Sequence, residues 1–543
     1  MPTIRQHPLF LLPTALIGLA LLVFLGYFVI YNVYAVALFQ FPFDYDQGEG
    51  FELVDTLLFS QGEWPYRDND RYPFYSSNYP PVFHLVTAPL VWLFGPHYWT
   101  GRLVGYLGTL VTAAAIGWAV WRQGRRWWLA VLSGLAFLAS NYVYHVGPLF
   151  RQHMFMVMFE TLAVVWLTHT LEREETDGRR YNWRLLGVMV LLLLAGYTKQ
   201  LAYATVVAVF AFWALRQTRR AIAWAIPFAA VTALLFFAIN WATHGEWFIA
   251  TVTANVNRFV PGQALGLFRQ WFQLHTLLVI ISGAYLIYQL YLERLSAYSL
   301  WFACATLNSV TAGKWGAGES YFATAIAASC LVTGVAFSRL LNGLQTDEWR
   351  RARPRLSGVA VWLALTVIPL LFLWQAGKVY HMPTRLPWLR ATAQMLGKPT
   401  ETFIAPQTSC SAPRPPEAVP YVDSVGPTLL GRPPEPADTQ AGMEIVRLIA
   451  AGQTPAFSEE AGFNLRIGRT VVTNPTQLLN LYQNNQVNLS EMLDMLDRQA
   501  FDTVVLRAQF YPPPVLDMIG QRYTTTHLVP MNGFVYCVLQ PRR

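Results

Sequence analysis

Two groups of charged residues stand out in an otherwise apolar sequence. Lys199 lies beside Gln200, between two apolar runs, residues 185–197 and 201–215. A charged side chain near the middle of a bilayer costs roughly 3 kcal/mol even on the most lenient insertion scale, so it is normally retained for a function. The second group is the segment FDYDQGEG, residues 43–50, which follows a long apolar run and carries three carboxylates. A carboxylate at the boundary of water and lipid can deprotonate a hydroxyl group.

The spacing of Asp46 and Glu49 has two compatible interpretations. In one, Asp46 is the N-cap of a helix and Glu49 is its capping-box partner. In the other, Asp46 is a catalytic base, which a cap would also hold in place. Apolar residues continue with helical spacing through residues 51–58, and Gly62 ends the pattern. We therefore expect an amphipathic helix that lies on the membrane surface.

The composition indicates which class of protein positions these residues. The chain has 543 residues, of which 54% are hydrophobic and only 13% are charged, with a mean hydropathy of +0.31. A soluble domain carries about 25% charged residues, so this is a membrane protein. The net charge of +8 does not indicate a nucleic-acid partner, because the basic residues fall in short clusters between apolar runs. Four cysteines are too few for a disulfide framework, although Cys410 and Cys537 could pair.

The apolar runs predict a polytopic α-helical membrane protein with about eleven transmembrane helices. The first run is too long for a signal peptide, so we expect an uncleaved span. Arginine-rich loops alternate with arginine-poor loops, which places the N-terminus in the cytoplasm and, with an odd number of spans, the C-terminal region outside. The expected spans are residues 11–38, 98–121, 128–147, 154–171, 185–197, 200–215, 221–242, 271–292, 298–313, 319–338 and 357–376.

Three regions follow from this pattern. Residues 1–376 form the transmembrane module, in which residues 39–97 are the first outer loop and the short apolar segment 80–95 lies at the membrane interface. Residues 377–436 are a proline-rich linker. Residues 437–543 form a small extracytoplasmic α/β domain. In this domain we expect helices at residues 442–451, 476–484 and 489–498, and strands at residues 455–458, 470–473, 502–507 and 533–539.

Several segments, in this order, resemble the GT-C superfamily of integral-membrane glycosyltransferases, which includes protein mannosyltransferases and the lipid A aminoarabinose transferase. Those enzymes place an acidic motif after the first span, where this chain has FDYDQGEG. The other similar segments are GYTKQLA (196–202), VTANVNRF (252–259) and AGKWGAGESYF (312–322). The resemblance covers residues 1–376 and extends to the C-terminal domain. One departure, Arg151-Gln152-His153 where relatives often have Arg-x-Asp, puts a second acidic partner or a metal ligand in question there.

The resemblance implies transfer of a sugar, with inversion, from a polyprenyl-phosphate carrier to a hydroxyl acceptor, which could be a lipid, a glycan or a protein. The leaving phosphate needs cations but no general acid, unlike the leaving group of a glycosidase. The implied base is Asp46, with Asp44 and Glu49 as substitutes. The implied phosphate ligands are Lys199, Arg151, Lys314 and, as a weaker fourth, Arg102. An alternative for all four, weakest for Lys199 with its apolar flanks, is a cation that extends to the interface from the end of a span.

A transporter or flippase of lipid-linked glycans is the main alternative to a glycosyltransferase. Such a protein would show repeated halves with paired broken helices, and the sequence has no internal repeat. A non-catalytic scaffold would not explain Lys199. His145 and His153 lack the spacing of metal ligands, so we expect no cofactor and do not favour a divalent metal.

Overall fold

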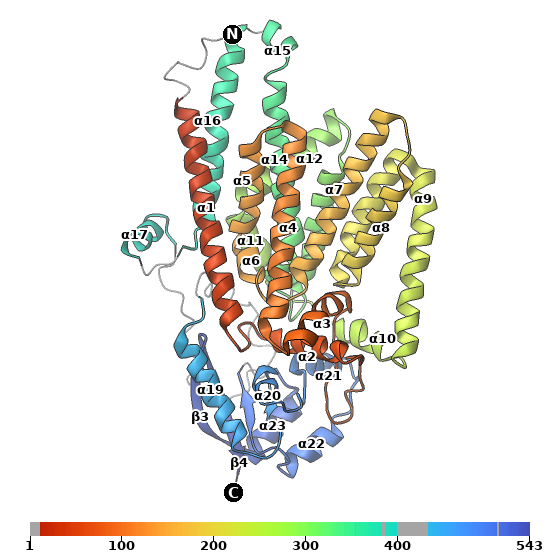
Figure 1. Cartoon of the computed structure of the whole chain (residues 1–543), viewed down its shortest axis with the longest axis vertical. Coiled ribbons are helices and arrows are strands. Elements are labelled where there is room, and N and C mark those ends of the chain that lie inside the picture. The colour runs from red at the N-terminus through yellow and green to blue at the C-terminus, as the bar shows by residue number, and fades with distance from the viewer. Residues whose placement is uncertain (1–10, 353, 383–385, 399–432, 508–509, 543) are drawn as a thin grey trace.

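The computed structural model describes residues 11–352, 354–382, 386–398, 433–507 and 510–542. Long helices form a bundle, and a smaller domain near the C-terminus covers one end of it (Figure 1). This mostly helical architecture with a small C-terminal sheet confirms the predicted fold class. The linker predicted for residues 377–436 lies in large part outside the described residues, as does Cys410.

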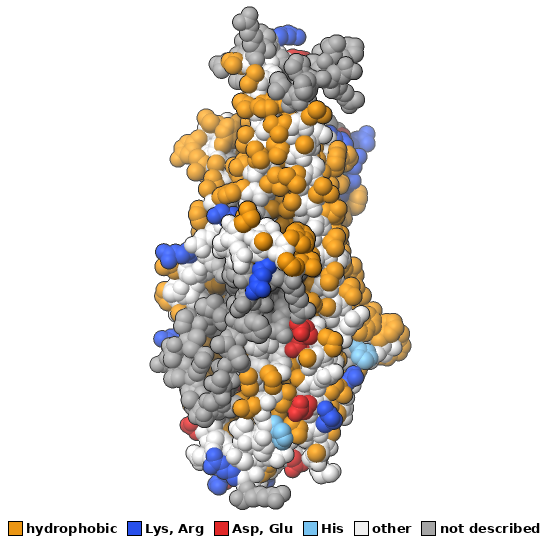
Figure 2. All heavy atoms as spheres, turned by 90° about the vertical axis from the view of Figure 1, so that its left-hand side faces the viewer, with side chains coloured by type: hydrophobic (Ala, Val, Ile, Leu, Met, Phe, Trp, Pro, Cys, Tyr) orange, Lys and Arg blue, Asp and Glu red, His pale blue; other side chains and the backbone are white. Residues whose placement is uncertain are grey.

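Apolar sequence runs form the bundle because a helix satisfies its backbone polar groups internally, as a lipid environment requires. Large apolar side chains face outward along these helices, for example Leu22, Trp241 and Tyr291. Figure 2 shows hydrophobic side chains gathered over the upper part of one face, away from the C-terminal domain. The bundle helices are α1 (Leu11–Gln40), α4 (Tyr98–Gly124), α5 (Trp127–Ala139), α6 (Asn141–Val146), α7 (His153–Asp177), α8 (Asn182–Gly196), α9 (Tyr203–Ala242), α11 (Pro261–Leu274), α12 (Thr276–Leu292), α13 (Ala297–Asn308), α14 (Ala323–Gly343) and α16 (Pro354–Lys378).

The chain is a multi-pass membrane protein. The number of spans counted from the lengths of its helices differs from the number predicted from the apolar runs of the sequence. Six of the described helical segments are long and apolar enough to cross a bilayer, or seven if α11 and α12, which meet at 94°, form one span. The predicted span 128–147 is divided at Ser140 into α5 and α6. The predicted spans 200–215 and 221–242 run together as α9, which has non-helical backbone at Gln217. The count of eleven therefore stays a prediction.

Short helices join the bundle elements and lie mainly at its two ends. They are α10 (Glu246–Thr251), α15 (Asp347–Ala352), α17 (Pro387–Met395) and the 3₁₀ turns η3 (Gln200–Ala202), η4 (Thr253–Asn255), η5 (Ser309–Gly313) and η6 (Glu319–Phe322).

The first loop contains α2 (Glu49–Ser60), which overlaps the predicted amphipathic helix. This helix is not exposed on a membrane surface, because residues 49–56 are all buried. Phe51 and Val54 share an apolar cluster with Ala461 and Val471 of the C-terminal domain. The domain therefore covers the helix face that the sequence pattern assigns to the membrane surface.

The same helix begins later than the spacing of Asp46 and Glu49 predicts. Its N-cap is Gly48, whose φ of 101° lies in the left-handed region. Gly48 has no side chain to cap the helix, and the carboxylate of Asp44 accepts the hydrogen bond from the first-turn N–H of Gly50 instead (2.6 Å). The Glu49 carboxylate accepts a hydrogen bond from the backbone N–H of Asp46 (3.3 Å), which is one half of a capping box. The Asp46 carboxylate does not make the other half, so its interpretation as an N-cap is wrong.

The interfacial segment predicted at residues 80–95 forms α3 (Val82–Phe94). With 13 residues, α3 is too short to cross a bilayer, and it exposes Trp92 and Leu93 on its outer face. Its inner face, with Phe83 and His84, is buried and packs toward α2. The two short helices lie between the bundle and the C-terminal domain (Figure 1).

The C-terminal domain contains a four-stranded sheet with the order β1-β2-β4-β3. β1 pairs with β2 in parallel, whereas β4 is antiparallel to both β2 and β3. The elements are α19 (Pro436–Ala450), β1 (Phe457–Ser458), α20 (Gly462–Arg466), α21 (Pro475–Gln483), α22 (Ser490–Asp497), β2 (Val504–Leu506), α23 (Pro513–Arg522), β3 (Tyr523–Met531) and β4 (Phe534–Pro541).

The strand predicted at residues 470–473 is not part of this sheet. Instead, Thr473 makes an isolated bridge with Phe74 of the first loop. Next to it, the side-chain amide of Gln477 donates a hydrogen bond to the carbonyl of Ser77 (2.8 Å). The segment that precedes α21 therefore fixes the domain to the first loop.

Candidate active site

A polar pocket lies where four parts of the chain meet. These are the start of α2, the later part of the first loop, the turn between α6 and α7, and the loop between η5 and η6. The C-terminal domain completes the pocket. Its lining residues are Gln47, Gly48, Phe51, Glu52, Asn78, Tyr79, Arg151, Trp315, Gly316, Asn474, Thr476 and Phe510.

Arg151 links two carboxylates at this pocket. Its Nε and Nη2 atoms donate hydrogen bonds to Oδ2 of Asp46 (2.9 and 2.6 Å), and Nη2 also donates to the carbonyl of Gln47. Its Nη1 atom lies 3.5 Å from Oε1 of Glu52. The backbone of Gly48 lies so close that a Cβ there would be 2.9 Å from two guanidinium nitrogens. Glycine at this position therefore allows both the positive φ and the approach of Arg151.

Glu52 is a pocket residue that the sequence motifs do not indicate. Its side chain is 2% exposed. Burial raises the pKa of the Glu52 carboxyl to about 7, and the charges of Arg151 and Lys199 limit this rise. One feature of the sequence could have indicated Glu52. It lies three residues after Glu49, a spacing that places both carboxylates near one face of a helix.

Lys199 lies in the break between α8 and η3, at the same end of the bundle. Its Nζ atom lies 4.2 Å from the ring centre of Tyr79, which lines the pocket, and 5.6 Å from that of Tyr321. Nζ is buried and has no hydrogen-bond partner in the described part of the chain. Burial lowers the pKa of Lys199 to about 7, although the charge of Glu52 acts in the opposite direction. A buried ammonium group in this state would gain from a bound anion.

Glu49 and Arg102 form a closed ion pair away from the pocket. The guanidinium of Arg102 donates to both carboxylate oxygens of Glu49 (2.9 and 2.8 Å), and the backbone N–H of Phe150 donates to Glu49 as well (2.7 Å). The remaining Arg102 donors bind three backbone carbonyls, those of Leu38, Phe41 and Phe43. Both side chains are 0% exposed. This geometry fits a structural role for both residues, and Arg102 does not extend to the interface. The expected roles of Glu49 as a substitute base and of Arg102 as a phosphate ligand stay predictions.

Asp44 is also committed to structural contacts. Its carboxylate accepts hydrogen bonds from the N–H of Gly50 (2.6 Å), the hydroxyl of Tyr98 (2.6 Å) and the N–H of Gly462 (3.2 Å). It is buried and connects α2, α4 and the C-terminal domain. Asp44 therefore positions the loop, and its expected role as a substitute base stays a prediction.

Lys314 lies beside the pocket without lining it. The next two residues in the chain, Trp315 and Gly316, do line it. Lys314 is half-buried, and its backbone pairs with that of Phe259. Among the four expected phosphate ligands, Arg151 lines the pocket, Lys199 approaches it through Tyr79, and Lys314 is adjacent. Arg102 does not line it and is paired with Glu49.

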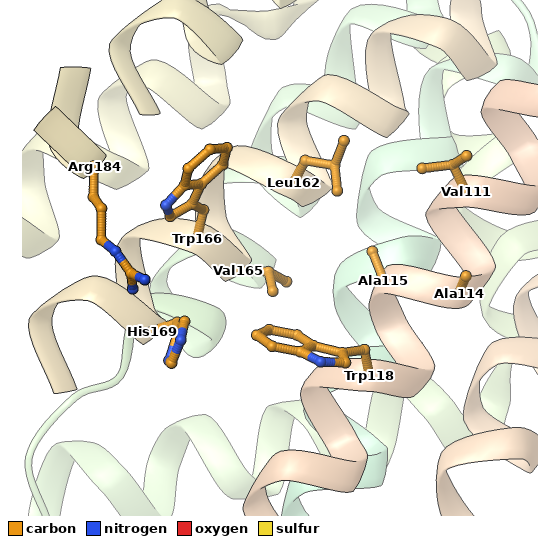
Figure 3. A pocket seen from close by; sticks show the side chains of 9 residues that line it. All are labelled: Val111, Ala114, Ala115, Trp118, Leu162, Val165, Trp166, His169 and Arg184. Atoms are coloured by element: carbon orange, nitrogen blue, oxygen red, sulfur yellow. The ribbon is translucent and has the colours of Figure 1, made fainter. Parts of the chain in front are cut away.

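A second, apolar groove lies between α4, α7 and α8, far from this pocket. It has a volume of about 480 Å³ and is lined by residues such as Trp118 and Trp166, with His169 and Arg184 at one side (Figure 3). Sixteen residues of α7 separate His169 from His153. At 1.5 Å per residue this is roughly 24 Å along the helix. The groove is therefore separate from the polar pocket, which is lined by Arg151, two residues before His153.

No protein-family model matches the chain, and neither does any curated protein sequence. Two crystal structures of ArnT, an aminoarabinose transferase from Cupriavidus metallidurans, match almost the whole chain. The structure bound to undecaprenyl phosphate has 15% sequence identity and a TM-score of 0.55, over 96% of this chain and 98% of that chain. The apo structure has 16% identity and a TM-score of 0.54, over 96% and 97%. The chain has the GT-C fold.

A third GT-C structure is the apo form of the oligosaccharyltransferase from Archaeoglobus fulgidus. It has 13% identity and a TM-score of 0.50, over 92% of this chain and 73% of that chain. The expected resemblance to the GT-C superfamily is thus confirmed for the fold. At such low identity, an assignment of function rests on the chemistry of the pocket.

Proposed function

We propose that this GT-C protein is a membrane glycosyltransferase that transfers a sugar from a polyprenyl-phosphate carrier to a hydroxyl acceptor, with inversion. The observation that carries the proposal is the grouping of Asp46, Arg151 and Lys199 around one end of the bundle. The GT-C fold supports it, as does the bound undecaprenyl phosphate of the similar ArnT structure.

In this proposal, Lys199 and Arg151 bind the donor phosphate. Lys199 contributes a buried ammonium group without a hydrogen-bond partner among the described residues. Arg151 contributes Nη1, whose one contact among the described residues is the 3.5 Å ion pair with Glu52. Two cations stabilise the charge that develops on the leaving phosphate, so no general acid is needed. Lys314 precedes the pocket residues Trp315 and Gly316, so it would assist phosphate binding at the rim of the pocket.

Asp46 is the proposed base. Its side chain is 20% exposed, whereas Glu52 is almost fully buried. One oxygen, Oδ2, receives both hydrogen bonds from Arg151. A donor phosphate would compete for Arg151 and weaken this pair, which would free the carboxylate to accept the proton of the acceptor hydroxyl. A single base and direct attack are consistent with inversion.

The proposed orientation places the pocket and the C-terminal domain outside the cell membrane and the N-terminus in the cytoplasm. The arginine-rich loops support this orientation, because they lie at the opposite helix ends from the pocket. For example, Arg122 and Arg125 lie at the C-terminal end of α4. The acceptor, which is a lipid, a glycan or a protein, would reach the pocket between the first loop and the C-terminal domain. Asn474 and Phe510 of that domain lie at this entrance.

The experiment compares Asp46→Asn and Lys199→Met with matched controls, Asp68→Asn in the same loop and Lys378→Met at the end of α16. Membranes containing each variant receive polyprenyl-phosphate sugars and an extract of acceptors. Loss of a general base should lower transfer by about 100-fold or more, and the controls should keep normal rates. Normal transfer by both folded site variants would refute the site.

A flippase is the alternative, and the same membranes distinguish it. A flippase would move the labelled lipid between leaflets without releasing polyprenyl phosphate. Asp46 precedes α2, Arg151 lies between α6 and α7, and Lys199 precedes η3, so all three lie at ends of bundle elements. This position favours the transferase, because transporter sites lie near the bilayer midplane between repeats.

A further inference from the structure

Three potential metal ligands meet behind the pocket, on the first loop. Glu52 and Asp55 lie three residues apart on α2, and His84 lies on α3. The Nε2 atom of His84 is 3.3 Å from Oε2 of Glu52 and 3.8 Å from Oδ2 of Asp55. All three side chains are at most 3% exposed. This cluster is distinct from His145 and His153, the two histidines that the sequence brings to attention.

The hydrogen bonds around His84 determine which ring nitrogen carries its proton. The hydroxyl of Thr56 donates its only hydrogen to the carbonyl of Glu52 (2.7 Å). The same hydroxyl lies 3.0 Å from Nδ1 of His84, so Nδ1 must be the donor in that contact. The Nε2 atom therefore presents a lone pair, and it points at two carboxylates.

This arrangement needs a positive group between the three side chains. Neither Nε2 of His84 nor Oε2 of Glu52 has a hydrogen-bond partner in the described part of the chain, although both are buried. Two buried carboxylates beside a lone pair are costly unless a proton or a cation neutralises them.

The neighbours of Glu52 favour a cation over a proton. Nη1 of Arg151 lies 3.5 Å from Oε1 of Glu52, and an adjacent guanidinium stabilises the ionised carboxylate. Asp55 accepts hydrogen bonds from the hydroxyls of Tyr75 (2.7 Å) and Ser77 (2.6 Å), and these bonds hold its carboxylate beside His84. With a divalent cation bound, the two carboxylates would be ionised, and together with a neutral imidazole they would balance its charge.

The spacing and the ligand types fit zinc. With bonds of about 2.1 Å, the ligand atoms of a tetrahedral site lie about 3.4 Å apart, close to the 3.3 and 3.8 Å observed. An imidazole ligand disfavours magnesium and calcium, which prefer oxygen. Thr56, Tyr75 and Ser77 supply the outer hydrogen bonds that orient metal ligands in proteins.

We infer that Glu52, Asp55 and His84 bind a structural divalent cation, with zinc as the best match, that joins α2 to α3 beneath the pocket. The site does not depend on which reaction the pocket catalyses. The ion holds Glu52 through Oε2, while Oε1 faces Arg151. It therefore acts on the pocket by positioning Glu52.

The experiment uses the full-length protein, purified in detergent, treated with a chelator and then incubated with Zn²⁺ or Co²⁺. After desalting, elemental analysis should find about one zinc per wild-type chain, and far less in His84→Gln and Asp55→Asn. The matched control is His153→Gln, another buried histidine near the pocket, which should bind zinc normally. The cobalt form should show the visible absorption of a tetrahedral site in the wild type and the control only.

A second measurement keeps the test valid if the ligand variants do not fold. Zn²⁺ should raise the thermal midpoint of the wild-type protein, and a chelator should reverse the rise. Zinc binding by His84→Gln equal to that of the wild type would overturn the inference. A wild-type protein that binds neither ion would also overturn it and would assign the missing positive group to a proton on Glu52.

Discussion

Replacement of Lys199 by methionine separates the function of this residue from its cost to stability. The two side chains have similar length, but methionine carries no charge. Lys199 is buried, with Glu52, Arg151 and the rings of Tyr79 and Tyr321 around it. Without a bound anion, the ammonium group loses hydration and regains no hydrogen bond from the described residues.

The magnitude follows from the pKa of Lys199, which falls from 10.5 to about 7 on burial. At about 1.4 kcal/mol for each pKa unit, the buried lysine costs the folded protein about 4 kcal/mol at pH 7. Between pH 7 and 10.5 the unfolded chain holds this proton and the folded chain does not. The free energy of unfolding of the wild type should therefore rise with pH over this range, relative to that of Lys199→Met.

The assay is unfolding in mixed detergents at several pH values, with and without added polyprenyl phosphate. Lys199→Met should be the more stable protein at pH 7, by up to about 4 kcal/mol, and this advantage should shrink toward pH 10. Polyprenyl phosphate should stabilise the wild type and not the variant. A variant that is less stable at pH 7, with unchanged response to the lipid, would refute the reasoning about Lys199.

Three further predictions concern neighbouring groups. Arg102→Met should lower the free energy of unfolding by about 3–5 kcal/mol because it leaves Glu49 charged and buried, and Arg102→Met with Glu49→Leu should recover part of this in the same assay. Gly48→Ala should lower the free energy of unfolding by about 1–2 kcal/mol, because the φ of 101° is strained for alanine. It should also raise the donor KM, because the new Cβ would meet Arg151. An unchanged KM would contradict this prediction. The donor KM should rise above pH 7 as Lys199 loses its proton, and Lys199→Arg should remove that dependence.

The bundle was predictable because long apolar runs have few other solutions in a protein of this composition. The number of spans was not, because breaks within runs depend on packing. Ser140 and His275 show this, since they interrupt apolar runs and form a hydrogen bond with one another at 2.8 Å. No local pattern announces such a contact between residues 135 positions apart. Similarly, β3 has a run of exposed residues, 524–528, so it lacks the alternation that predicts a strand.

The candidate site was predictable only where a residue type is unusual for its surroundings. Lys199 is unusual between apolar runs, and Asp46 and Arg151 lie at the ends of such runs. The structure brings these three to one end of the bundle, while their roles remain proposed. Glu52, Asp55 and His84 gave no signal, because an acidic pair on a short helix is common and the histidine is distant in sequence. Their relation arises from the packing of α2 against α3.

Glu52 couples the two proposed sites, and this coupling predicts an effect of chelation on catalysis. Its Oε2 atom faces His84 and Asp55, whereas its Oε1 atom faces Arg151. Removal of a cation from Oε2 would let Glu52 take up a proton, since burial raises its pKa to about 7, and a neutral Glu52 would hold Arg151 less firmly. Chelation should therefore raise the donor KM several-fold, with a smaller effect on kcat than Asp46→Asn, and zinc should restore the KM. If zinc binds in the expected amount but its removal leaves the donor KM unchanged, the cation supports the fold of the first loop without influencing Arg151.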